Sequence, residues 1–186
     1  TISTGKDPQW KLLFAAAEPE AEKPSAEAVR AAVEADPGAA ARPFATPAGW
    51  EPVKGALVRL RLGLGEKNGL RAGELATVRN AYDFGIYLWR NGKDLSSGFQ
   101  PADLAHGFDG WLPLHAAAYL ALDDAALSVV LAAHPAAAAE PDAGGMLPLA
   151  LALARDDTSD DAAVLLAEAA PDAGGADGHS PAHLAA

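Results

Sequence analysis

Residues 109–118 have the sequence Asp-Gly-Trp-Leu-Pro-Leu-His-Ala-Ala-Ala, and this stretch decides the predicted fold. The glycine allows a tight turn before a helix. The proline at the first helical position loses no hydrogen bond, because an amide there has no partner inside the helix. The alanines that follow predict a slim helix against which a neighbouring element can pack closely.

The pattern recurs twice downstream. Residues 143–152 have the sequence Ala-Gly-Gly-Met-Leu-Pro-Leu-Ala-Leu-Ala, and residues 177–186 have Asp-Gly-His-Ser-Pro-Ala-His-Leu-Ala-Ala. The prolines Pro113, Pro148 and Pro181 lie 35 and 33 residues apart. This spacing is typical of helix-pair repeats that stack into a solenoid.

A second helix is expected in each unit. Asp123 and Asp160 are acidic residues placed to start it, and Pro135 and Pro171 are placed to end it, because proline cannot continue a helix. A weaker copy precedes these units: residues 10–17 match the Trp-to-Ala part of the motif, and Ser25 is expected to cap a following helix. For residues 8–42, a generic Ala-rich helical hairpin is the alternative.

The motif resembles the signature of ankyrin repeats, D-x-x-G-x-T-P-L-H-x-A-A, with Leu112 in the Thr position. The resemblance covers residues 109–186 well and 8–42 weakly, and it fades where Ala150 replaces the His. It implies a stack of helix pairs that binds other proteins. It also implies that His115 and His183 tie their turns to a neighbouring unit.

The middle of the chain predicts β structure. Residues 56–62 alternate, with Val58, Leu60 and Leu62 on one face and Arg59 and Arg61 on the other. Residues 75–79 and 85–89 are rich in strand formers, and the Asn-Gly pair at 91–92 predicts a hairpin turn. The pattern resembles small SH3-like barrels; a simple antiparallel meander is the alternative.

The predicted fold is therefore mainly α: an ankyrin-like helix-pair solenoid with a small all-β, SH3-like barrel in the middle. Its domains are residues 1–49, a divergent helix pair; 50–106, the barrel; and 107–186, ankyrin-like repeats with the last one truncated. The composition supports the division, since residues 51–104 carry a formal charge of +2 within a chain of −11.

Charge and composition exclude several classes of protein. A chain with formal charge −11 lacks the clustered Lys and Arg that nucleic acid requires. It has no Cys for thiol chemistry or Cys-based zinc sites, and no apolar run long enough to span a membrane. Peripheral association with a membrane complex stays open. The start at Thr1 is explained equally by a removed targeting peptide or by a missing upstream segment.

The residues that could carry chemistry favour structural roles. Residues 63–69 are rich in Gly, but no helix is expected after them, so we predict a loop of the barrel instead of a phosphate site. The five His lack ligand spacing. The acidic run at 156–161 fits a helix start. We therefore predict no enzyme, and no catalytic, cofactor or metal site.

The aromatic residues of the β module are the candidate binding site. Tyr82, Phe84, Tyr87 and Trp89 are interleaved with Arg79, Arg90 and Lys93, and aromatics with Arg are enriched in protein interfaces. Of these, we expect Tyr82, Tyr87, Trp89, Arg79 and Arg90 to contact a partner. In the alternative, Phe84 and Trp89 fill the core of the barrel.

The expected function is a non-catalytic interaction module or scaffold that binds another protein through its repeats. One alternative is a structural or linker subunit of a large complex, organellar or of a photosynthetic membrane. Another is the interaction fragment of a multidomain enzyme such as a ubiquitin ligase. The compartment is open, organellar if the N-terminus is processed and otherwise cytoplasmic.

Overall fold

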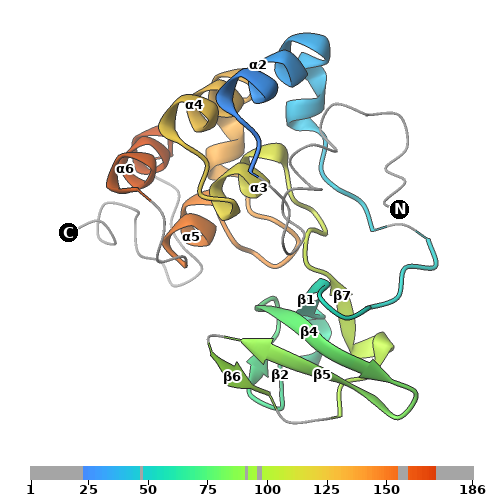
Figure 1. Cartoon of the computed structure of the whole chain (residues 1–186). Helices are drawn as coiled ribbons and strands as arrows, with labels where there is room; N and C mark the ends of the chain where they lie inside the picture. Colours follow the sequence, from blue (N-terminus) through green and yellow to red (C-terminus); the bar gives the residue numbers. More distant parts are fainter. Residues whose placement is uncertain (1–22, 47, 91, 96–97, 155–158, 171–186) are drawn as a thin grey trace.

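Helices and strands occupy separate regions of the molecule (Figure 1). The structure is a computed structural model that describes residues 23–46, 48–90, 92–95, 98–154 and 159–170. Within these residues, the chain enters the helical region, crosses to the sheet, and returns through its last strand to the helices. The two regions meet along one face of the sheet.

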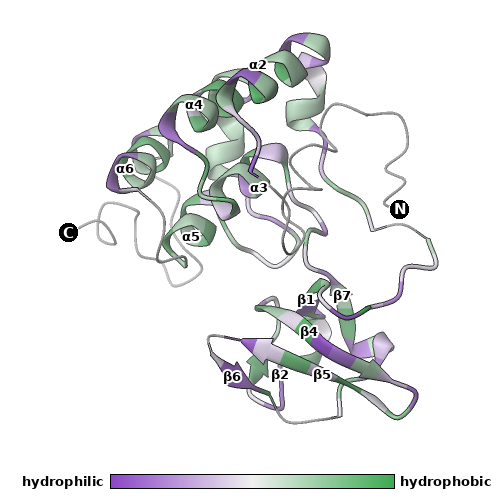
Figure 2. Cartoon of the chain, in the orientation of Figure 1, coloured by the Kyte–Doolittle hydropathy of each residue, from purple (hydrophilic) through white to green (hydrophobic). Residues whose placement is uncertain are grey.

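The helical region has two rows of helices. The outer row contains α2 (Ala26–Ala35), α4 (Asp124–Ala133) and α6 (Asp160–Ala169), and the inner row contains α3 (Pro113–Tyr119) and α5 (Pro148–Leu153). Short 3-10 helices, η1 (Pro37–Ala41) and η4 (Pro135–Ala139), follow α2 and α4. Figure 2 colours α4 and α5 as mainly hydrophobic, as expected of elements packed on several sides.

Side-chain caps explain where the outer helices begin. The amide of Ala28 donates to Ser25 Oγ at 3.3 Å, and the amide of Ala126 donates to Asp123 Oδ1 at 2.8 Å. These bonds satisfy amides that have no partner inside the helix. Ser25 and Asp123 are therefore confirmed as helix starts, whereas α6 is capped by Ser159 and places Asp160 in its first turn.

The sheet is antiparallel, with strand order β6-β5-β4-β1-β7. Its strands are β1 (Leu57–Leu60), β4 (Leu75–Tyr82), β5 (Gly85–Arg90), β6 (Lys93–Asp94) and β7 (Leu104–His106). A separate ribbon pairs β2 (Glu66–Lys67) with β3 (Leu70–Arg71). Short 3-10 helices, η2 (Leu62–Leu64) and η3 (Pro101–Asp103), lie beside these strands.

One face of the sheet carries its own small core. The residues that alternate inward along the strands pack with Leu70 of β3 and with Phe99, which lies between β6 and η3. The buried members are Ala56, Val58, Leu60, Leu70, Ala76, Val78, Ile86, Leu88, Phe99 and Leu104. This period-two burial confirms the predicted strands at residues 75–79 and 85–89. The two-residue connection after Arg90 is likewise confirmed, since Arg90 pairs with Lys93.

The prediction of a mainly α, ankyrin-like solenoid is wrong. The described residues form a mixed α/β fold: a five-stranded antiparallel sheet with about five helices, and no helix-pair solenoid. The Gly-x-Leu-Pro-Leu motif specifies how a short helix starts, which is a local property. A solenoid also needs three or more successive pairs that bury one another, and the described residues supply only two complete pairs, α3–α4 and α5–α6. The third copy of the motif and the match at residues 10–17 lie outside the described residues.

The predicted SH3-like closed barrel is also wrong. The sheet is open, with β6 and β7 at its edges, and no pairing joins these two strands in the described chain. The reason is their length: β6 has two residues and β7 has three, which is too few to close a barrel. The domain boundaries at 49/50 and 106/107 stay a prediction.

A buried ion pair joins the two regions. Arg59 on β1 donates from Nη2 to Asp142 Oδ2 at 2.7 Å and to the carbonyl of Gly107 at 2.5 Å. The two charged side chains are only 3% and 0% exposed. Asp142 also accepts from Trp111 Nε1 at 2.8 Å and from the amide of Met146 at 2.9 Å. The predicted alternation placed Arg59 away from the sheet core correctly, but that face is covered by the helical region.

The environment of Asp142 keeps it ionised. Burial by itself would raise the pKa of this carboxyl. The hydrogen bond and charge of Arg59, together with backbone amides, outweigh burial and hold the pKa below its ordinary value. The ion pair is therefore a charged link across the junction, at neutral pH as well as in mild acid.

Candidate functional site

The second face of the sheet is covered by helices at one end and open at the other. We call it the outer face. Residues that pair directly across two strands share a face, and Thr77 pairs with Trp89 while Asn80 pairs with Tyr87. These four residues alternate with the buried positions of the sheet core, so they point outward. The outer face thus runs along β4 and β5 from the junction to the hairpin turn.

A β-bulge interrupts β4 at Arg79. Val78 pairs with Leu88 and Asn80 pairs with Tyr87, so two steps along β4 match one step along β5. The extra residue of a bulge has no partner in the ladder. Beyond the bulge, Tyr82 pairs with Gly85 and stands on the outer face beside Tyr87.

Three aromatic side chains gather at the hairpin turn, and we call them the tip cluster: Tyr82, Phe84 and Tyr87. The rings of Tyr82 and Phe84 are stacked, with centroids 5.1 Å apart and planes 3° apart. The Tyr87 ring is nearly perpendicular to Tyr82, with centroids 5.7 Å apart. Tyr82 is 52% exposed and Phe84 is 72% exposed. A cluster of large apolar rings in contact with water is a typical mark of a binding surface.

The predicted aromatic site is thus brought together in part. Tyr82, Tyr87 and Trp89 all lie on the outer face, and Trp89 is 46% exposed. The alternative that Phe84 and Trp89 fill a core is wrong, because both are exposed and Ile86 and Phe99 occupy the core. Phe84 was missing from the predicted set, although its place between two predicted strands indicates a turn residue that reaches solvent.

The two predicted arginines are engaged in ion pairs. Arg79 pairs with Asp94 on β6, and both side chains are exposed. Arg90 makes two bonds to Glu74, with Nη1 2.7 Å from Oε2 and Nη2 3.0 Å from Oε1. Each arginine therefore has its charge balanced by a neighbouring carboxylate. Whether they contact a partner remains a prediction.

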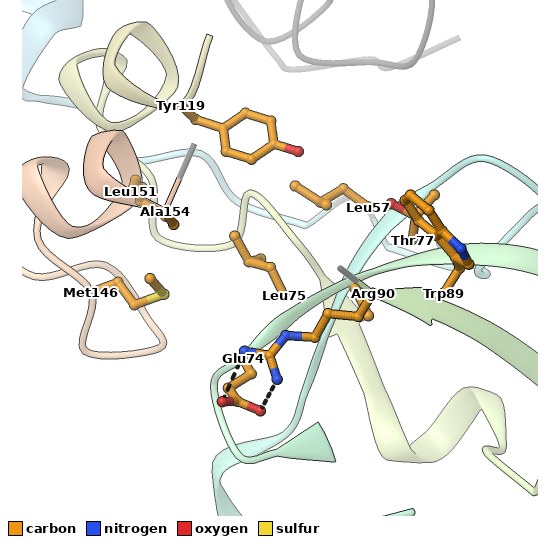
Figure 3. A pocket seen from close by; sticks show the side chains of 11 residues that line it. Leu57, Glu74, Leu75, Thr77, Trp89, Arg90, Tyr119, Met146, Leu151 and Ala154 are labelled. Carbon is orange, nitrogen blue, oxygen red and sulfur yellow. Dashed lines mark hydrogen bonds and ion pairs between the residues drawn. The ribbon is translucent and has the colours of Figure 1, made fainter. Parts of the chain in front are cut away.

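A cleft of about 420 Å³ lies between the sheet and the helices (Figure 3). Thr77 and Trp89 line it from the outer face, and the Glu74–Arg90 pair lies at its rim. Across from them are residues that we call the helical wall: Tyr119, Met146, Leu151 and Ala154. Leu57, Leu75 and Ala76 complete the lining. Its volume is in the range of ligand pockets, and its lining is largely apolar. Sequence patterns could not reveal it, because its two sides come from separate regions.

The helical side of the cleft belongs to a strongly acidic segment. Residues 107–154 contain five acidic residues and no Lys or Arg. One of the five, Asp142, is balanced by Arg59. None of the five lines the cleft, so the segment contributes a negative formal charge to the helical region without placing a carboxylate in the cleft itself.

The histidines of the described chain have structural surroundings. His115 is fully buried; its Nδ1 accepts from the amide of Leu112 at 3.1 Å, so its Nε2 donates to the carbonyl of Met146 at 3.2 Å. This bond confirms that His115 ties its turn to the next one. Burial also lowers its pKa, which keeps the ring neutral. His183 lies outside the described residues.

The Gly-rich stretch at residues 63–69 has no helix after it. It runs from η2 into the β2–β3 ribbon, whose turn contains Asn68 and Gly69, both with positive φ. A phosphate site of the loop-and-helix type needs a helix N-terminus at this place, which the ribbon does not offer. The acidic run at 156–161 lies largely outside the described residues.

The described residues show neither a metal-binding group nor a helix that could cross a membrane. No group of three or more His, Cys, Asp or Glu stands close enough there to hold a metal ion. Among the helices of that part of the chain, none has the length and apolar character needed to cross a membrane.

Comparison with known proteins finds no match to a family model, to a curated protein or to a solved structure. The outer face and the cleft are therefore the features from which a function can be inferred.

Proposed function

We propose that this chain is a non-catalytic protein-interaction module that holds a partner protein on the outer face of the β4–β5 hairpin. The observation that carries the proposal is the tip cluster, in which the stacked rings of Tyr82 and Phe84 are 52% and 72% exposed. Exposed apolar area of this kind costs free energy in water, and burial against a partner recovers it.

Further features support the same face. The tip cluster and Trp89, which lines the cleft, lie along β5 on the same face, so a partner that spans this strand can contact aromatic rings and the apolar cleft together. Aromatic residues surrounded by polar and charged groups are typical of the centre of a protein interface. The Arg79–Asp94 pair joins β4 to β6 across β5, with Asp94 opposite Trp89, and the Arg90–Glu74 pair lies at the rim of the cleft, so both pairs supply polar groups to this face.

Photo-crosslinking tests the proposal. The photoreactive residue p-benzoylphenylalanine is placed at Asn80, which lies on the outer face opposite Tyr87. The matched control carries it at Val164, which is 46% exposed on α6. The full chain is irradiated in its source cell, and adducts are identified by mass spectrometry.

We expect a discrete adduct with one protein from the Asn80 position and none from Val164. The adduct should disappear when Tyr82, Phe84 and Tyr87 are all replaced by Ser, while the circular dichroism spectrum stays unchanged. An Asn80 variant that gives no adduct, or the same set of adducts as Val164, contradicts the proposal.

A further inference from the structure

We infer that the partner presents an extended basic segment, with an apolar side chain in the cleft and a Lys or Arg over the tip cluster four residues away. This inference rests on the proposed function and specifies the chemistry of the partner. It follows from the spacing along β5, from the open aromatic faces at the turn, and from the charge of the surroundings.

The spacing comes from the strand itself. Trp89 lines the cleft, and Gly85 begins β5 beside Tyr82, so four residues separate the cleft from the tip cluster. A strand rises about 3.3 Å per residue, which makes this path about 13 Å long. A partner in extended conformation covers the same length in four residues. Its side chains at positions i and i+4 then point to the same side, toward the outer face.

The tip cluster is suited to a cation. Tyr82 and Phe84 each cover one face of the other ring, and Phe84 is still 72% exposed, which leaves its remaining surface to solvent. The face of an aromatic ring carries partial negative charge and attracts the ammonium of Lys or the guanidinium of Arg. Asp83 occupies the turn between the two rings and adds a full negative charge at the same place.

Two nearby cations, Arg79 and Arg90, are held in ion pairs away from the rings of the tip cluster. Arg79 is paired with Asp94, and Arg90 is paired with Glu74, so neither contributes an unbalanced positive charge to the outer face. Across the cleft, residues 107–154 carry acidic residues and no Lys or Arg. A basic side chain is therefore favoured over an acidic one at the tip cluster, where Asp83 is exposed and the whole chain has a formal charge of −11.

The cleft is suited to an apolar side chain. Leu57, Leu75 and the helical wall supply aliphatic and thioether surface on both sides. The volume of about 420 Å³ admits a side chain of the size of Leu, Met or Phe together with part of its backbone. Met146 can adjust its conformation to different shapes, since its side chain is unbranched.

A second copy of this chain is a poor occupant. Two copies carry a formal charge of −11 each, so they repel each other at low salt. The described residues also offer no basic segment with the required spacing next to an exposed apolar residue.

The test extends the Asn80 crosslink by mapping the crosslinked peptide of the partner. We expect a segment with Lys or Arg four residues from Leu, Ile, Met or Phe, in either direction. An acidic or uncharged segment overturns this inference and leaves the proposed function standing. An adduct with a second copy of the chain also overturns it. The absence of any adduct overturns the proposed function itself.

A binding titration measures the contribution of the cation–π contact. The mapped segment is synthesised with a fluorescent label and titrated against the full chain by anisotropy. Phe84→Leu keeps apolar area but removes the ring, and we expect the Kd to rise about two- to fivefold. The rise should vanish for a peptide in which the Lys or Arg is replaced by norleucine. An equal effect on both peptides shows a merely apolar contact and overturns the assignment of the cation to this site.

Discussion

The cores of the helical region and of the sheet region differ in residue composition. Eleven of the 25 buried residues in the helical core are Ala, compared with two of ten in the sheet core. Ala brings helix backbones close together but removes little apolar area from water, whereas the Val, Leu, Ile and Phe of the sheet fill volume. Small side chains therefore let the helices of the helical region pack at short distances, whereas large side chains fill the core of the sheet region.

This difference explains why the two regions share a face. A core of ten residues is small for an independent sheet, and three or more strands need a covered apolar face to be stable. The helices cover part of the second face, where Leu57 joins their core. The remaining part stays open and carries the aromatic residues.

The largest effect is expected at the ion pair that joins the regions. Asp142→Ala leaves Arg59 charged and buried and removes the acceptor for Trp111 Nε1. Breaking a buried pair on one side costs about 3–5 kcal/mol. Urea unfolding followed by circular dichroism measures this loss. The control is Asp94→Ala, which removes an exposed partner of Arg79 and should leave the midpoint nearly unchanged. Equal shifts in the two variants would show that the regions do not depend on the buried pair.

The next effect is a dependence of stability on pH. His106 contacts the rings of Phe44 and Trp50, with centroids 4.9 and 4.8 Å away. Burial lowers the pKa of His106 from 6.5 to about 4; the charge of Asp109 opposes this shift and that of Arg59 reinforces it. Between these values the unfolded chain binds a proton that the folded chain does not. Stability is therefore full above about pH 6.5 and falls toward pH 4, by about 3 kcal/mol at most.

Urea unfolding at several pH values measures this dependence. In His106→Gln the decline between pH 6.5 and pH 4 should be shallower, with the remainder arising from His115, whose pKa burial also lowers. An NMR titration in which the His106 ring protonates with a midpoint near its ordinary value would contradict the prediction.

A smaller effect is expected where two backbones approach across the junction. A Cβ added at Gly144 would overlap Arg59 Nη1 and lie 2.9 Å from the carbonyl oxygen of Gly73. Gly144→Ala should therefore destabilise the chain by about 1–3 kcal/mol, as overpacking does. Gly63→Ala is the control, since no atom lies within 4 Å of its added Cβ. Thermal unfolding compares the two, and a neutral Gly144→Ala would mean that the junction can open without cost.

The smallest effect is expected at the open end of the outer face. Phe84→Ala removes a side chain that is 72% exposed, so the free energy of unfolding should change by only about 0.5 kcal/mol. Phe99→Ala, at a fully buried position, serves as the reference and should cost about 3–5 kcal/mol. A large loss in Phe84→Ala would show that the tip cluster supports the sheet, which would argue against a role in binding.

Local features were predictable from the sequence, and long-range ones were not. The helix starts at Ser25 and Asp123 and the two-residue turn after Arg90 depend on neighbours in sequence, so short patterns identify them. The open sheet depends on edge strands of two and three residues, which leave no pattern of their own.

In the candidate site, too, the local features were predictable from the sequence and the long-range ones were not. The alternation of residues along β5 predicts that Tyr87 and Trp89 share a face. The cleft needs Trp89 to meet Tyr119 and Met146, which stand far away in sequence and are brought together only by the junction. The burial of Arg59 was missed for the same reason, because a charged residue at an outward position of a strand ordinarily faces water.

The bulge at Arg79 determines which side chains of β4 share a face with those of β5. If the same sequence paired without a bulge, Arg79 would stand opposite Tyr87 and every position of β4 beyond Val78 would change sides, because neighbouring side chains of a strand alternate. Tyr82 would then turn inward while Tyr87 stayed outside, and the stacked pair of rings would be divided between opposite sides of the sheet. Deletion of Arg79, in contrast, should leave Asn80 opposite Tyr87 and Tyr82 opposite Gly85, so the aromatic surface should survive the loss of the bulge residue.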